Sequence, residues 1–442
     1  MKKKFILSLF VFCLMLPVLA NAGSVSSRYD VTFGGFVKYD LGWNSQNIHA
    51  DVSLPQRSSS SAVDVLADEY SNTFQSAAET RFNFLIKGPD LGGAKTSAFI
   101  EGDFRGVTTG NAYGGFMLRH AFMTMKWPSA ELMIGQNWQQ WGMPYYGAWI
   151  GTSNYTQFLR GIRTPQIAYR YFFTKEFNAM VGLTSATEWS GNGTAPYVRG
   201  YNDDKARSDW PGLMGEIAYW SDRCGKIGSN NLKFGLGGYY GRENKIANAG
   251  TVTAPTASSA TGYEDDMTDS WIAAFRYSVP IIPEKQGKKA MAFLINGNFF
   301  IGQNTAGNGW MGLTNNISQG TYWRAVDEAA APTMYGLFAQ ASFWFTDSLS
   351  INGLYGYLKY NYSSWARGAA TDADAQNRRN LPNMVRQYGA TLLWDANQAI
   401  RFGLEWTQIY ASFNGNGPGP GTSFAENNGT INQYRVAAYY FF

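Results

Sequence analysis

The chain has 442 residues, of which 45% are hydrophobic and 16% aromatic. Three of its 36 basic residues are the lysines at positions 2–4; without them 33 basic residues stand against 32 acidic ones, so there is no charge excess of the kind that binds nucleic acid. Beyond the first 22 residues no apolar run is long enough for a membrane-spanning helix. Of the two cysteines only Cys224 lies beyond them, so no intrachain disulfide is expected.

The first 22 residues have the layout of a secretory signal peptide. A basic start precedes an apolar run over positions 5–19 and the small-x-small sequence Ala20-Asn21-Ala22, which predicts export and cleavage after Ala22. An uncleaved membrane anchor is the alternative, but the run is short for a spanning helix. No Pro-rich or charged linker divides the remainder, so residues 23–442 are expected to form a single domain.

Alternation of apolar and polar residues begins soon after this segment. In VTFGGFVKYDLGW (31–43), odd positions such as Val37 and Trp43 are apolar, whereas even positions such as Lys38 and Asp40 are polar. A period of two predicts a β-strand with one apolar and one polar face. The pattern recurs in ETRFNFLIKG (79–88), KTSAFIEGDFRG (95–106), SWIAAFRYSV (270–279) and AIRFGLEWTQ (399–408).

The spacers between the predicted strands alternate between short and long. Seven short spacers, such as 88–94 and 395–397, separate eight long ones that are rich in Gly, Asn, Ser and Thr. Strands of about 9–13 residues are long enough to cross a bilayer at a tilt. Tyr and Trp cluster near the strand ends, where membrane proteins place them at the two membrane–water interfaces. These features predict an all-β fold, a transmembrane antiparallel up-and-down β-barrel of about 16 strands with both ends in the periplasm. A secreted β-sandwich or β-helix is the alternative.

The chain ends on a predicted strand, QYRVAAYYFF (433–442). Because a lipid-exposed strand edge is not tolerated, this strand is expected to pair with residues 31–40 and close the barrel. Its alternate residues should face lipid, and the last should lie at the periplasmic interface. These residues are Tyr434, Val436, Ala438, Tyr440 and Phe442.

Charged residues on the polar strand faces are expected to line the lumen, because an arginine that faces lipid costs about 2–4 kcal/mol at the bilayer midplane. Arginines outnumber acids among them, which predicts a mild preference for anions. The alternative for any one residue is that it hydrates the lumen and pairs with its neighbours. The predicted pore-lining residues are Arg81, Glu101, Asp103, Arg105, Arg170, Arg276, Arg401, Glu405 and Arg435, and Glu79 shares their face.

The third long spacer, GMPYYGAWIGTSNYTQFLRGIR (142–163), is too aromatic for a loop exposed to water. In porin-like barrels a loop can fold into the lumen. This loop is predicted to form the constriction with Trp149, Tyr155, Arg160 and Arg163, of which the two arginines would meet anionic solutes. Packing at a contact between subunits is the alternative.

The strand MLRHAFMTMKW (117–127) is ambiguous from its sequence. If Met123 and Met125 face lipid, Arg119 shares their side and His120 faces the lumen. An outward Arg119 near the outer rim could bind a lipopolysaccharide phosphate or a neighbouring subunit.

No catalytic residue is expected, because the chain has only two histidines and neither lies beside a plausible nucleophile. No cofactor and no metal site are expected either. The segment DADAQNRRN (372–380) lacks the Gly and the terminal Glu of an EF-hand loop, and it leaves only a surface calcium contact open.

Three stretches resemble the DcaP-like outer-membrane porins. GGFVKYD (34–40) is similar to their first strand, residues 81–106 to their second hairpin, and LRHAFMTMKWPSAELMIGQNWQQW (118–141) to their third. The resemblance implies a trimer of sixteen-stranded barrels that passes small, often anionic solutes such as dicarboxylates. Some relatives carry a long helical segment before the barrel, for which Gly23–Asp30 leaves no room. No functional residue of the family can be matched individually.

The terminal strand resembles the sorting signal of bacterial outer-membrane proteins. This resemblance implies that the barrel-assembly machinery reads Tyr434, Val436, Tyr440 and Phe442.

Together, these patterns predict a porin of the Gram-negative cell outer membrane that lets small hydrophilic, anionic, carboxylate-type solutes diffuse passively, and not an enzyme. The expected partners are further copies of the chain in a homotrimer, outer-membrane lipid and lipopolysaccharide, the barrel-assembly machinery and the solutes. An adhesin that uses the long loops is the alternative, followed by an outer-membrane barrel enzyme.

Overall fold

The described part of the computed structural model is a single antiparallel sheet of seventeen strands. Within it, no helix has the length and apolar character needed to cross a membrane. The predicted signal peptide (1–22) lies outside the described residues. These are residues 29–46, 55, 70–106, 114–151, 163–184, 211–246, 263–303, 333–361, 382–413 and 426–442.

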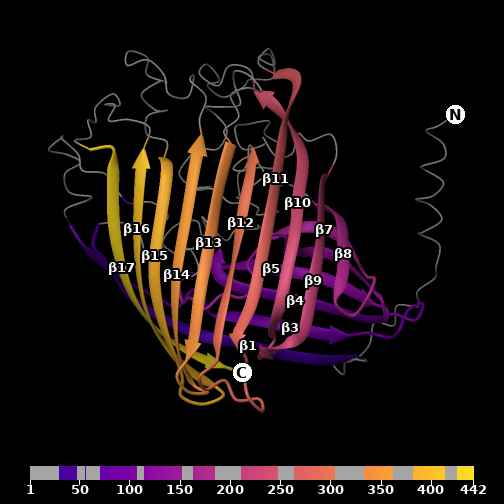
Figure 1. Cartoon of the computed structure of the whole chain (residues 1–442), viewed down its shortest axis with the longest axis horizontal. Helices are drawn as coiled ribbons and strands as arrows, with labels where there is room; N and C mark the ends of the chain where they lie inside the picture. The colour runs from indigo at the N-terminus through magenta and orange to yellow at the C-terminus, as the bar shows by residue number, and fades with distance from the viewer. Residues whose placement is uncertain are drawn as a thin grey trace.

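From β3 onward each strand pairs with the next, and β1 pairs with β17, so the sheet closes into a barrel (Figure 1). The strands are β1 (Asp30–Asn44), β2 (Asn72–Ser76), β3 (Arg81–Lys87), β4 (Lys95–Gly106), β5 (Gly115–Lys126), β6 (Ala130–Trp138), β7 (Arg163–Phe172), β8 (Phe177–Thr184), β9 (Gly212–Ile227), β10 (Asn230–Ile246), β11 (Tyr263–Ile282), β12 (Phe293–Gln303), β13 (Thr333–Trp344), β14 (Leu349–Asn361), β15 (Pro382–Asp395), β16 (Ile400–Phe413) and β17 (Asn428–Phe441).

Two of the seventeen strands share one position in the barrel wall. β3 pairs with residues 30–36 of β1, and β2 pairs with residues 40–44. Residues 77–80 interrupt the ladder between them. The barrel therefore has sixteen strand positions, and the predicted closed antiparallel barrel of about 16 strands is confirmed.

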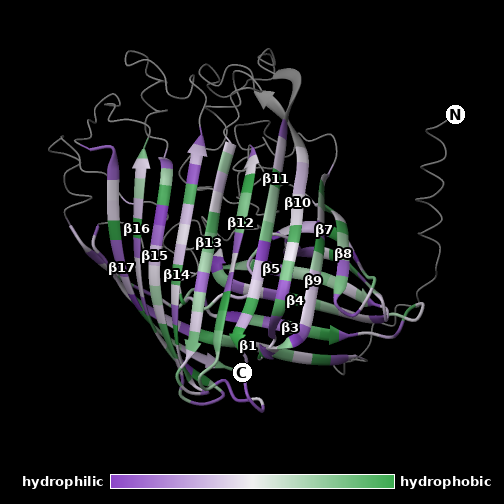
Figure 2. Ribbon diagram, in the orientation of Figure 1, coloured by the Kyte–Doolittle hydropathy of each residue, from purple (hydrophilic) through white to green (hydrophobic). Residues whose placement is uncertain are grey.

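Alternation along each strand separates an outer apolar face from an inner face that is largely shielded. In β1, Val37 is 51% exposed on the outside, whereas Lys38 is 0% exposed on the inside. Figure 2 shows the resulting alternation of hydrophobic and hydrophilic residues along the strands. The energetic reason is that large apolar side chains can face lipid at no cost, whereas charged ones cannot.

The closing seam joins the first and last strands. Its register runs from Phe36 opposite Phe441 to Asn44 opposite Gln433. At its end, the backbone groups of Gly35 and Phe442 exchange two hydrogen bonds of 3.2 Å. The last residue is therefore part of the ladder, and its backbone is held by β1.

Candidate functional site

The segment 139–151, which follows β6, leaves the wall and enters the barrel interior. Its carbonyl at Met143 accepts a hydrogen bond from Arg276 of β11 (3.1 Å), and its N–H at Ile150 donates to Glu405 of β16 (2.7 Å). Because β11 and β16 lie on different parts of the wall, the segment crosses the interior and narrows it.

Glu405 and Lys38 hold the far end of this segment. The Glu405 carboxylate accepts hydrogen bonds from the N–H groups of Ile150 (2.7 Å) and Gly151 (3.1 Å) and from the Thr391 hydroxyl (3.1 Å). The Lys38 ammonium donates to the Ile150 carbonyl (2.6 Å). Charge-assisted hydrogen bonds of this kind are stronger than neutral ones. Both the N–H and the carbonyl of Ile150 are thus held by charged side chains of the barrel wall.

Two arginines share one carboxylate at the near end of the segment. Arg276 forms an ion pair with Glu216 at 2.5 Å, and Arg170 lies 3.5 Å from the same carboxylate. Arg170 also donates to Asn178, and Arg276 donates to the Gln140 carbonyl (3.2 Å). The group carries more positive than negative charge, and it binds the crossing segment through backbone carbonyls.

Tyr145 of the crossing segment packs on this basic group. The Arg276 guanidinium lies 4.2 Å from the centre of its ring, and the Lys233 ammonium lies 5.5 Å from it. The Trp220 indole N–H donates to the Tyr145 hydroxyl (3.2 Å). Burial raises the pKa of the Tyr145 hydroxyl above its ordinary value, so the ring stays neutral and contributes cation–π contacts and a hydrogen bond.

Arg119 points into the barrel and not toward lipid. Glu101 of β4 pairs with His120, but the next residue, Gly102, pairs with Leu118. Arg119 is therefore the extra residue of a β-bulge, which lets two successive side chains face the same side. The prediction that Arg119 shares a side with the outward methionines of β5 was wrong because the bulge resets the alternation.

Arg119 takes the short contacts to two inward acids. Its guanidinium donates to Glu101 at 2.8 Å and to Asp103 at 2.7 Å. Arg81 faces the same carboxylates from β3, but at 3.5 Å and 3.9 Å. His120 is also inside, 3.8 Å from Glu101. Since Arg119 already neutralises the two acids in part, Arg81 is the less tightly held cation of the group.

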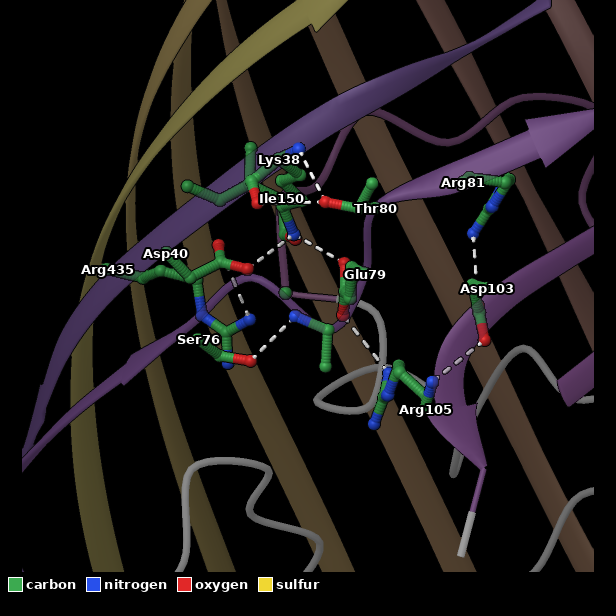
Figure 3. Close-up of polar contacts among 12 residues, drawn as sticks. Lys38, Asp40, Ser76, Glu79, Thr80, Arg81, Asp103, Arg105, Ile150 and Arg435 are labelled. Atoms are coloured by element: carbon green, nitrogen blue, oxygen red, sulfur yellow. Dashed lines mark hydrogen bonds and ion pairs between the residues drawn. The ribbon is translucent and has the colours of Figure 1, made fainter. Parts of the chain in front are cut away.

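A second network of charged side chains lies at the break between β2 and β3 (Figure 3). Lys38 forms ion pairs with Glu79, which sits in that break, and with Asp40 at 3.0 Å. Arg105 donates to Glu79 (3.1 Å), and Arg435 lies 3.9 Å from Asp40. Three cations and two acids thus surround the end of the crossing segment.

The crossing segment encloses a cavity of about 420 Å³ at the barrel end that carries the C-terminus. Tyr146 and Trp149 of the crossing segment are among its lining residues. The charged side chains that line it are Arg81, Lys289, Arg401, Glu79 and Asp395. Arg401 is bonded to Asp395 at 2.5 Å and 3.0 Å, so its charge is balanced, whereas that of Arg81 is not balanced by an equally short contact.

All nine residues predicted to line the pore have side chains inside the barrel. Arg81, Glu101, Asp103, Arg105 and Arg435 lie near the interrupted strand, Arg170 and Arg276 near Glu216, Glu405 at the end of the crossing segment, and Arg401 in the cavity wall.

The predicted constriction residues are described only in part. Trp149 lies inside, with its ring 6.0 Å from that of Phe338. Arg163 is the first residue of β7 and stacks on Trp138 at 5.2 Å, so it belongs to the wall and not to the loop. Tyr155 and Arg160 lie outside the described residues, as does the segment 372–380.

Of the predicted assembly residues, all four project outward. Tyr434, Val436, Tyr440 and Phe442 are 44–54% exposed.

The interior is less polar than the sequence pattern implied. A cluster of buried apolar side chains from β6–β17 packs around Trp141 of the crossing segment, which is 0% exposed. Members of this cluster include Met133, Met180, Met214, Phe300, Phe338 and Leu358. These residues face inward by the alternation of their strands, and they are buried in a cluster that includes Trp141 instead of facing lipid.

The sequence-derived set of pore-lining residues omitted several that the structure brings together, namely Lys38, Asp40, Arg119, Tyr145 and Glu216. Lys38 and Asp40 occupy the polar face in the first predicted strand, and Glu216 lies between outward Gly215 and Ile217. Alternation alone could have identified these three. No periodic signal marks Arg119, which lies in a bulge, or Tyr145, which lies in a loop.

Comparison with known proteins gives structural neighbours only. No model of a protein family matches the chain, and no curated protein matches it.

Solved structures of outer-membrane proteins and of a porin are similar in fold to the chain. The outer membrane channel DcaP of Acinetobacter baumannii superposes with a TM-score of 0.62 at 17% identity, over 95% of this chain and 100% of that one. An anion-selective porin from Comamonas acidovorans gives 0.54 at 12% identity, over 94% and 100%. The trimer form of the outer membrane protein OmpT of Vibrio cholerae gives 0.50 at 11% identity, over 94% and 100%. At these identities the likeness establishes the fold: the chain has the barrel architecture of DcaP and related porin structures.

Proposed function

We propose that this protein is a passive outer-membrane channel for small hydrophilic anions, in particular carboxylate-type solutes. The observation that carries the proposal is the position of Arg81. It lines the 420 Å³ cavity, and its contacts to Glu101 and Asp103 (3.5 and 3.9 Å) are longer than those that Arg119 makes to the same carboxylates. A guanidinium held in this way can bind a carboxylate in two-pronged geometry.

The names of the structural neighbours support the same reading. DcaP is described as an outer membrane channel, and the Comamonas protein as an anion-selective porin. Among the inward charges described above, arginine and lysine surround Glu216, Glu79 and Asp40 in excess. A lumen with excess fixed positive charge favours anions.

Recording in planar bilayers tests the proposal. The purified protein should show ohmic conductance, and its reversal potential in a KCl gradient should indicate preference for chloride. Arg81→Gln should shift that potential toward potassium. Arg223→Gln is the matched control, because Arg223 is 79% exposed beside Glu176 and does not line the cavity. Absence of ohmic conductance would refute the channel, and cation preference in the unmodified protein would refute the anion selectivity.

The crossing segment 139–151 supports the proposal that the third long loop forms the constriction. Its bonds to Glu405 and Lys38 keep it within the interior. A variant that lacks this loop should have a wider pore. An unchanged conductance would contradict the role of the loop.

Location and assembly belong to the same proposal. The signal-peptide pattern, the outward apolar face and the neighbours' names support the cell outer membrane and a homotrimer. Native mass spectrometry of detergent-extracted protein should give three times the mass of the mature chain; a monomer mass in every detergent would argue against the trimer. The barrel-assembly machinery as a partner, and the absence of enzyme activity, stay predictions.

A further inference from the structure

Two cations lie side by side on the outer surface of the barrel. Lys359 of β14 and Arg386 of β15 project outward, whereas every other described outward position on β12–β17 is uncharged. Lys359 pairs across the sheet with Met384, two residues from Arg386. Diagonal neighbours of this kind lie about 7–8 Å apart at Cα, so both long side chains can reach one ligand.

Tyrosines surround these two cations. Arg386 is directly opposite Tyr357 on one side and Tyr410 on the other, and its guanidinium lies 5.8 Å from the Tyr410 ring. Tyr335 is opposite Lys359, and its ring lies 6.3 Å from that of Tyr357. The phenol groups add hydrogen-bond donors to the positive charge.

This basic–tyrosine patch (Tyr335, Tyr357, Lys359, Arg386 and Tyr410) lies near one rim of the barrel. β13 starts at Thr333, β14 ends at Asn361 and β15 starts at Pro382, all within a few residues of the patch. In Figure 1 these strand ends lie opposite the end that carries the C-terminus. The surface farther along the strands is apolar, with Ile351, Trp394 and Leu404 each at least 40% exposed.

A cation on a lipid-facing surface is costly in the hydrocarbon region and tolerated at the interface. Tyrosine prefers that interface because its ring is apolar and its hydroxyl is wet. An anionic lipid headgroup at this level would compensate both charges, and its acyl chains would cover the apolar surface below. Free phosphate would satisfy the cations but would leave that surface without a partner.

We propose that the basic–tyrosine patch binds a phosphate group of an outer-leaflet lipid. Lys359 supplies a point charge, Arg386 a two-pronged contact, and the hydroxyls of Tyr335 and Tyr357 hydrogen bonds. This inference rests on the proposed outer-membrane location. It moves the predicted lipopolysaccharide contact from Arg119, which is inside the barrel, to a different face.

Binding of bisphosphorylated lipid A to the purified, folded protein in detergent tests the patch, with native mass spectrometry as the readout. The Lys359→Gln/Arg386→Gln variant should retain at least tenfold less lipid A than the unmodified protein. The matched control is Lys285→Gln/Lys288→Gln, which removes two exposed lysines from the turn between β11 and β12 and should retain the normal amount. Lipid A without its phosphates should bind weakly to all three proteins.

Several outcomes would overturn the proposal. These are equal retention of lipid A by the patch variant and the control, equal binding of the dephosphorylated lipid, or patch-dependent binding of inorganic phosphate without binding of lipid A. Folding is checked by heat-modifiable migration, and the single variant Arg386→Gln serves if the double variant does not fold. Conductance should be the same in all variants because both side chains lie outside. Normal conductance with no lipid A binding would refute only the patch, whereas absent conductance with normal lipid A binding would refute only the channel.

Discussion

Glu405 accepts hydrogen bonds from the backbone N–H groups of Ile150 and Gly151, at 2.7 and 3.1 Å, although about 250 residues separate them in the chain. The carboxylate belongs to β16 and is 4% exposed. It therefore joins the end of the crossing segment 139–151 to the far wall. We expect the depth to which the segment enters the barrel to depend on this contact.

Glu405→Gln should loosen the crossing segment. An amide has one acceptor oxygen, and its NH₂ group would face a backbone N–H, so one buried donor loses its partner at a cost of about 1–3 kcal/mol. We expect larger and noisier single-channel conductance and a lower temperature of unfolding. Glu284→Gln is the matched control, because Glu284 also accepts from a backbone N–H, that of Gly228 at 2.6 Å, but on an exposed turn. Equal conductance of both variants would show that Glu405 does not position the segment.

Arg276→Gln should destabilise the barrel and reduce anion preference together. The substitution leaves Glu216 facing Arg170 at 3.5 Å, and breaking a buried ion pair from one side costs about 3–5 kcal/mol. The double variant Arg276→Gln/Glu216→Gln should lose further stability, since it also leaves the buried guanidinium of Arg170 without its carboxylate partner. Chemical denaturation in detergent gives the free energies, and reversal potentials give the selectivity. A double variant as stable as the unmodified protein would contradict this effect of charge.

The architecture could be predicted from the sequence because each strand carries its own signal. Alternation of apolar and polar residues with a period of two predicts each strand, and the apolar residues predict which face of the strand points out of the barrel. The alternation of short and long spacers predicts the number of strands. The seam between β1 and β17 follows from the need to leave no edge, and Phe36 does pair with Phe441. These are local patterns joined by one physical rule, so each of them can be recognised in a single sequence.

The interior could be predicted only where the strands are regular. The bulge at Arg119 turns an expected outward side chain inward, and the interruption at 77–80 places Glu79 beside Lys38. Both features break the two-residue alternation of apolar and polar side chains, so an analysis based on that alternation cannot predict them. The apolar residues around Trp141 were missed for a further reason: their burial depends on where a loop from β6 packs, and that is a tertiary contact.

Phe442→Ala should reduce the amount of assembled barrel more than it changes the pores that form. The Phe442 ring packs at 5.2 Å from Phe33 and 6.1 Å from Phe82 on the outer face, away from the lumen. Quantifying heat-modifiable protein in outer-membrane fractions measures assembly, and bilayer recording measures the pores. Ile281→Ala is the control, since Ile281 is 51% exposed near the same barrel end. Equal loss of assembly in both variants would indicate lost lipid contact and not a terminal signal.

Lys38→Met should destabilise the protein strongly, and a second substitution, at Asp40, should reduce that loss of stability. Lys38 is 0% exposed and neutralises Asp40 and Glu79 while it bonds to the Ile150 carbonyl. Removing it leaves Asp40 with Arg435 at 3.9 Å, and the loss expected for a buried pair broken from one side is about 3–5 kcal/mol. The comparison is Lys87→Met, which breaks an exposed lysine–aspartate pair of 2.7 Å with Asp30 and should cost at most about 1 kcal/mol.

The same substitution separates charge from anchoring. Adding Asp40→Asn to Lys38→Met should recover part of the stability, because it removes the acid whose remaining ion-pair contact, with Arg435, is as long as 3.9 Å. It should not restore the conductance of the unmodified protein, because the Ile150 carbonyl still lacks its donor, and among the described contacts at that end the segment keeps those to Glu405 and to Gln340, which accepts from the Ala148 N–H. Denaturation curves and single-channel recording on the two variants distinguish the effects. If conductance returned together with stability, Lys38 would serve the wall and not the crossing segment.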